Sequence, residues 1–199
     1  TLNAGADAYN VAVGMHAGLS MSTGIQNTIV GGLAGDALTT GGKNVAIGHS
    51  ALSTEDAHGN NVAIGYQALT SLNAGADAHN VAVGFKTGEA LTTGAGNTLI
   101  GGLAGDALTT GAENVAIGRQ ALSAETTGDT NVAIGSNAMS SATLARRNVA
   151  VGFQALQDLT YSSLTLSYNI GVGHAAGANI TSGVRNVIMG GLAGDALTT

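Results

Sequence analysis

The chain has 199 residues, of which 32 are glycine and none is proline, cysteine or tryptophan. Only 9% of the residues are charged and 44% are hydrophobic, a balance that excludes a disordered chain, because disordered segments are charge-rich and poor in apolar residues. The net charge of −6, with six basic residues in all, argues against nucleic-acid binding, and no run of about 18 apolar residues exists that could span a membrane.

A short motif, Asn-Val-Ala-Val/Ile-Gly and its variants, recurs along the whole chain. In chain order its asparagine stands at Asn10, Asn27, Asn44, Asn61, Asn80, Asn97, Asn114, Asn131, Asn148, Asn169 and Asn186. Successive asparagines are 17 residues apart, apart from one spacing of 19 and one of 21. Such a constant period predicts a tandem array of about eleven repeats.

A longer period lies over the short one. The block GGLAGDALTT occurs at 31–40, 101–110 and 190–199, and LNAGADA occurs at 2–8 and 72–78. We therefore interpret 1–199 as a single repeat array with super-repeats at 10–79 (four coils), 80–168 (five coils) and 169–199 (a truncated unit). Repeat arrays need atypical caps, and we expect further fibre or surface-structure segments at both ends.

Each repeat, numbered from its asparagine as position 1, predicts one coil of a β-solenoid. Position 2 is β-branched in every repeat and position 4 is Val or Ile in all but the last, which favours a strand over positions 2–4. Position 5 is always glycine, as a corner with positive φ requires, and a second glycine near position 15 suggests a second strand and bend. The corner glycines are Gly14, Gly31, Gly48, Gly65, Gly84, Gly101, Gly118, Gly135, Gly152, Gly173 and Gly190.

Seventeen residues are too few for a strand–helix–strand unit, which needs about 30 residues. The prediction is an all-β, parallel β-solenoid of about eleven coils. With coils about 4.8 Å apart, it forms a rod on the order of 50 Å long.

The interior is predicted from two kinds of position. We expect the β-branched residues of positions 2 and 4, such as Val45 and Ile47, to point into the coil, with the large apolar residue of position 12, such as Leu38, opposite them. Where position 12 is not large, position 9 carries the bulk instead, as at Leu52. This exchange is typical of a core of constant volume.

The invariant asparagine has two structural interpretations that the sequence leaves open. Stacked asparagines can hydrogen-bond from coil to coil as an amide ladder. Alternatively, each asparagine can cap the strand entrance in a local Asx-turn.

Position 3 predicts how the chain assembles. Alternation along the strand would place it on the face opposite positions 2 and 4, yet it is apolar nearly throughout. We expect it to be covered by further copies of the chain, with a trimer favoured. The expected interface residues are Ala12, Ile29, Ala46, Ala63, Ala82, Leu99, Ala116, Ala133, Ala150 and Ile188.

The segments NVAIGYQAL at 61–69, NVAIGRQAL at 114–122 and NVAVGFQAL at 148–156 resemble the NTAIGYQAL-type repeats of phage tail fibres, with a marine-phage character. They also resemble the YadA-like head repeats of trimeric autotransporter adhesins. The resemblance implies a left-handed β-roll assembled as a homotrimer.

Catalytic and metal-binding patterns are weak. The block GGLAGDAL departs from the calcium nonapeptide. Glu89 and Asp106 share position 10 of neighbouring coils, but that column also holds Leu19, Ser53, Thr70, Ser140 and Ala178, so we expect no site built around the pair. The five histidines fall at several coil positions, so we expect no enzyme activity, metal or cofactor. The predicted function is an extracellular structural shaft of a phage tail fibre, part of the virion, that positions a distal receptor-binding tip. The alternative is a repeat region of a bacterial surface adhesin or filament.

Overall fold

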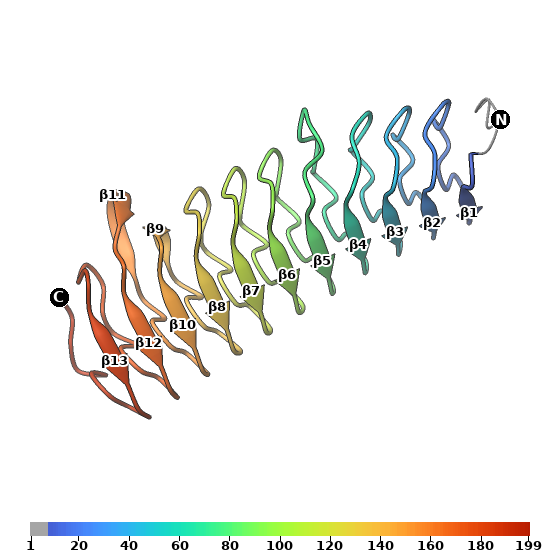
Figure 1. Cartoon of the computed structure of the whole chain (residues 1–199). Coiled ribbons are helices and arrows are strands. Elements are labelled where there is room, and N and C mark those ends of the chain that lie inside the picture. The colour runs from blue at the N-terminus through green and yellow to red at the C-terminus, as the bar shows by residue number, and fades with distance from the viewer. Residues whose placement is uncertain (1–7) are drawn as a thin grey trace.

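A computed structural model describes residues 8–199 as one β-solenoid whose coils stack along a single direction (Figure 1). The LNAGADA block at 2–8 therefore lies, apart from its last residue, outside the described residues. Eleven short strands form one sheet in the order β1-β2-β3-β4-β5-β6-β7-β8-β10-β12-β13. Their bounds are β1 (Val11–Val13), β2 (Thr28–Val30), β3 (Val45–Ile47), β4 (Val62–Ile64), β5 (Val81–Val83), β6 (Thr98–Ile100), β7 (Val115–Ile117), β8 (Val132–Ile134), β10 (Val149–Val151), β12 (Ile170–Val172) and β13 (Val187–Met189).

Every pair of neighbouring strands in this sheet is parallel and joins equivalent coil positions. Val45 pairs with Val62 and Ala46 with Ala63, and the register holds across both longer coils, as in the pairing of Val149 with Ile170. The insertions are therefore accommodated outside the sheet. This confirms the predicted all-β solenoid with a strand at positions 2–4. No helix that could cross a lipid bilayer occurs in residues 8–199.

The prediction of a second strand in each coil is wrong for most of the array. Regular strands outside the main sheet occur, within the described residues, only as β9 (Thr143–Arg146) and β11 (Thr160–Leu166), which pair in parallel. Elsewhere the second wall is a series of turns. Its backbone still bonds from coil to coil, as where the Thr92 N–H donates to the Thr109 carbonyl at 2.8 Å. Irregular backbone suffices there because the next coil satisfies it.

The orientation of the strands is the reverse of the one expected. Position 3 points into the coil, with Ala46, Ala63 and Ala116 fully buried, whereas Val45 and Ile47 are only partly buried and lie on the outer surface. The predicted burial of positions 2 and 4 is therefore wrong. The predicted burial of position 12 is confirmed, because Leu38 is fully buried, as are the residues that replace its bulk at position 9.

The reason is the small volume between the two walls. Where position 3 is large, position 9 of the same coil is glycine: a Cβ on Gly35 would lie 3.1 Å from Ile29 Cδ1, and one on Gly105 would lie 3.0 Å from Leu99 Cδ2. Position 3 therefore shares one close-packed space with positions 9 and 12. Alanine at position 3 leaves room for a leucine from the opposite wall.

Candidate functional site

The asparagines form a continuous ladder inside the solenoid. From Asn27 to Asn186, the backbone N–H of each asparagine donates to the Oδ1 atom of the asparagine one coil before it, at 2.8–3.1 Å. The Nδ2 atom most often donates across the coil to the carbonyl at position 15, as from Asn97 to Gly111 at 2.9 Å. The side chain therefore ties successive coils together and also joins the two walls of its own coil. Of the two interpretations of the asparagine, the ladder between coils is therefore the correct one for the Oδ1 atoms, and the local Asx-turn is not.

The corner glycines permit the close stacking of coils. All eleven have φ between +121° and +141°, a region that residues with a side chain avoid. A Cβ on Gly118 would lie 2.6 Å from the carbonyl carbon and oxygen of Gly135 in the next coil. Both constraints require glycine at position 5, as the sequence predicted.

The side chains expected at a subunit interface lie in the core instead. Ile29, Ala46, Ala63, Ala82, Leu99, Ala116, Ala133 and Ala150 are fully buried within a single chain, and Ile188 is 7% exposed. Ala12, in the first coil of the described residues, is exposed. A side chain covered by its own coil cannot contact a second copy, so the prediction of a position 3 interface is wrong.

The surface that does lack a cover is the outward face, defined as positions 2 and 4 of the main sheet. Among its 22 side chains the only polar ones are Thr28 and Thr98, and none is charged. Most are partly exposed, including Ile100 at 37%. The structure thus presents an apolar, largely β-branched surface along the main sheet.

A column of rings borders this face at position 6, directly after the corner glycine. His49 stacks on Tyr66 with ring centroids 5.7 Å apart, and Tyr66 stacks on Phe85 at 5.5 Å. Further along, Phe153 and His174 stack at 5.3 Å. The rings of Tyr66, Phe85 and Phe153 are about half exposed. The aromatic column extends the apolar surface past the edge of the sheet.

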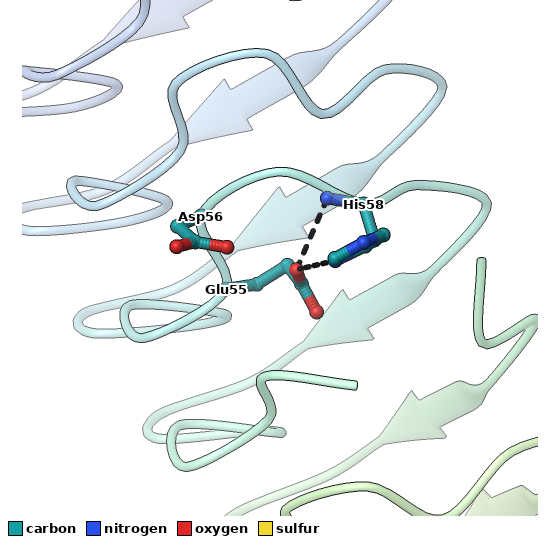
Figure 2. Close-up of side chains that lie close together, drawn as sticks. All are labelled: Glu55, Asp56 and His58. Carbon is teal, nitrogen blue, oxygen red and sulfur yellow. Dashed lines mark hydrogen bonds and ion pairs between the residues drawn. The ribbon is translucent and has the colours of Figure 1, made fainter. Parts of the chain in front are cut away.

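One cluster in residues 8–199 has the composition of a metal site. Glu55, Asp56 and His58 place three ligand atoms within 4.8 Å of one another. Figure 2 shows Glu55 and His58 facing each other, with the Glu55 Oε1 atom accepting from the His58 backbone N–H at 3.1 Å and lying 3.3 Å from His58 Nδ1. The other carboxylate oxygen accepts from the Ala74 N–H at 3.3 Å. Glu55 is fully buried, and both of its carboxylate oxygens accept from backbone N–H groups.

Glu125 supplies a direct comparison, because it occupies the same position 12 in another coil. Its Oε1 atom accepts from the backbone N–H groups of Thr126, Thr127, Gly128 and Leu144, and its Oε2 atom accepts from Ala145 at 2.8 Å. No histidine belongs to this arrangement. In both coils the carboxylate replaces a core leucine and satisfies N–H groups of the second wall. The shared role is structural.

Glu89 and Asp106, which share position 10 of neighbouring coils, differ in their surroundings. Glu89 accepts from Lys86 Nζ at 2.9 Å, and this hydrogen bond raises the pKa of Lys86. Burial raises the pKa of Asp106, whose Oδ1 atom is enclosed without a hydrogen-bond partner. Glu89 is therefore held in an ion pair, whereas Asp106 is not.

Comparisons with family models, curated proteins and solved structures gave no match. The function is therefore argued from the fold and its surfaces.

Proposed function

We propose that the chain is a structural shaft of a phage tail fibre, an extracellular part of the virion that holds a receptor-binding tip away from the particle. The observation that carries this proposal is the unbroken in-register stack of eleven strands in one sheet. A spacer must keep its length under load, and here each coil bonds to the next through the sheet, the second wall and the asparagine ladder. The assignment to a phage rests on the NVAIGYQAL-type repeats at 61–69 and their equivalents.

A deletion in register tests the shaft. Removing residues 80–147 takes out four 17-residue coils and joins 79 to 148 at equivalent positions. Because stacked repeats contact only their neighbours, the shortened chain should fold and the rod should lose about 19 Å of length by electron microscopy or solution scattering. If the shortened chain keeps its circular dichroism spectrum but the rod does not shorten by this length, the proposal of a shaft built from stacked coils is contradicted.

The second part of the proposal is that copies of this chain cover the outward face, forming a homotrimer. Eleven strands about 4.8 Å apart, each three residues long at about 3.3 Å per residue, present about 500 Å² from each copy. The three faces of a trimer together give about 1,500 Å², which lies within the range of specific protein interfaces. Identical rods also share one coil spacing, so a parallel copy matches the face along its whole length. The number three follows the repeats that the chain resembles.

Sedimentation tests this oligomer. The double variant Ile64→Glu/Ile117→Glu places two charges on the outward face, and Thr40→Glu/Thr93→Glu places the same charge on exposed positions elsewhere. At micromolar concentration the native chain and the threonine variant should sediment at three times 19.3 kDa, and the isoleucine variant at 19.3 kDa. A native monomer, or an isoleucine variant of unchanged mass, would refute the interface.

A bacterial surface adhesin or filament is the second candidate. The exposed rings of Tyr66 and Phe85 favour it, since aromatic side chains open to solvent are common where a surface makes contacts. The flanking sequence separates the two candidates. A virion-attachment domain supports the fibre, and a membrane anchor supports the adhesin.

A further inference from the structure

The charges of this chain are unevenly distributed. Residues 129–199 hold three of the six basic residues, Arg146, Arg147 and Arg185, and three acidic residues, Asp129, Asp158 and Asp195, a formal charge of 0. The remaining residues hold three basic and nine acidic residues, a formal charge of −6. The C-terminal coils are therefore neutral overall, whereas the remainder of the rod is acidic.

The fold brings two of these arginines into one column. Arg147, Tyr168 and Arg185 all occupy the last position before an asparagine, in three consecutive coils. The pairing of Val149 with Ile170 and of Ile170 with Val187 sets these coils side by side, so the two arginines are about 10 Å apart with the tyrosine between them. We call these three residues the arginine column.

The side chains of the column are exposed and lack acidic partners. Arg147 Nη1 donates to the Tyr168 hydroxyl at 2.8 Å, and its guanidinium lies 5.7 Å from the centre of the tyrosine ring. Arg146 differs, because it pairs with Asp129 at 2.6 Å. Among the ion pairs within residues 8–199, neither Arg147 nor Arg185 takes part. Their guanidinium charges thus face solvent, held at fixed spacing by the coils.

The longest insertion of the array lies beside this column. The 21-residue coil that begins at Asn148 contains β11, which pairs with β9 and carries the exposed side chains of Leu164 and Leu166. Figure 1 shows β9 and β11 beside each other at the loop side of the coils, away from the main sheet. In repeat proteins, insertions of this kind collect on one face, which is often the binding face.

We propose that the arginine column binds the oxyanion groups, carboxylate or phosphate, of an acidic polysaccharide. A guanidinium makes paired hydrogen bonds to either group, and the tyrosine ring between the arginines offers an apolar contact. Nucleic acid is disfavoured, because its phosphates lie much closer together than two coils and its dense charge is repelled by the acidic remainder of the rod. A polymer with one charged sugar in two matches the wide spacing better. The site does not depend on whether the chain is a fibre shaft.

Binding to immobilised polymers at low ionic strength tests the site. The probes are hyaluronate, with one carboxylate per disaccharide, and sparsely phosphorylated dextran, with phosphate groups at a similarly wide spacing. Neutral dextran and single-stranded DNA are the comparison polymers. The variant is Arg147→Gln/Arg185→Gln, which changes only exposed side chains, and the matched control is Arg119→Gln, an exposed arginine at position 6.

We expect the native chain to bind at least one of the two acidic probes, and the double variant to bind it at least tenfold more weakly. The Arg119→Gln control should bind like the native chain. Hyaluronate binding alone identifies the carboxylate, and binding of phosphorylated dextran alone identifies the phosphate. The proposal is overturned if neither probe is bound, if DNA is bound more tightly, or if Arg119→Gln weakens binding as much as the double variant.

Discussion

Replacing Asn114 with alanine removes one rung of the asparagine ladder from the middle of the rod. Asn114 Oδ1 accepts from the backbone N–H of Asn131 at 3.0 Å, and Asn114 Nδ2 donates to the Gly128 carbonyl at 3.0 Å. Both backbone groups belong to buried residues, and the substitution takes these partners away from them. A buried polar group without a partner destabilises by about 1–3 kcal/mol, so the variant should lose about 2–5 kcal/mol of folding free energy.

Denaturant unfolding followed by circular dichroism measures this loss. The matched control is Asn73→Ala, which truncates an exposed asparagine outside the ladder and should change the free energy of unfolding by less than about 0.5 kcal/mol. Because a repeat array can unfold in parts, hydrogen exchange at the Asn131 amide should be followed as well. That amide should lose protection before the distant coils do. Equal stabilities for the two variants would refute the ladder as a stabilising element.

Three further substitutions test the stacking, the core and one titrating group. Gly118→Ala should destabilise the fold by about 3 kcal/mol or more, because its Cβ would lie 2.6 Å from Gly135. Gly191→Ala, with open space around it, should be nearly neutral. Equal unfolding midpoints for the two variants would contradict the requirement for glycine at the corner. Leu108→Ala should cost about 2–5 kcal/mol in thermal unfolding because the side chain is fully buried, and a loss below 1 kcal/mol would contradict that packing. Burial raises the pKa of Asp106 above its value in the unfolded chain. The charged carboxylate therefore disfavours folding at pH values above the folded-state pKa, and this penalty is lost as the pH falls through that pKa. Asp106→Asn should raise the stability at neutral pH by about 0.5 kcal/mol or less and reduce the gain in stability on acidification, and a less stable variant at pH 7 would contradict this sign.

The coil period, the strand at positions 2–4 and the corner glycines could be predicted because each leaves an invariant mark at one place in every repeat. The orientation of the strand could not be taken from β-branching, because outward and inward faces are both apolar here. A usable signal was nevertheless present. The bulky Ile29 and Leu99 at position 3 each accompany a glycine at position 9, which already places positions 3 and 9 in one shared space.

The turns were harder to predict from residue types. Positions 7, 9 and 17 adopt left-handed φ values in coil after coil, yet non-glycine residues such as Gln67, Leu69 and Arg185 fill many of them. The conformation is imposed by neighbouring coils, as where the Arg185 N–H donates to the Ser167 carbonyl at 2.7 Å. Hydrogen bonds between coils offset the local backbone strain, so the residue type at these positions does not reveal the left-handed conformation. The arginine column was missed for a related reason, since its members are 21 and 17 residues apart and meet only when the coils stack.

The central claim is that copies of the chain contact one another through positions 2 and 4, while the side chains at position 3 lie in the core of each coil. Thiol labelling of single-cysteine variants tests this claim most directly. The native chain has no cysteine, so Val115→Cys, Ala116→Cys and the exposed control Thr93→Cys each report one site. The account predicts rapid labelling of Thr93→Cys and protection of Ala116→Cys at every concentration. Val115→Cys should be protected in the oligomer and should label rapidly once dilution separates the copies. Labelling of Val115→Cys as fast as Thr93→Cys at all concentrations, or rapid labelling of Ala116→Cys in the folded chain, would contradict it.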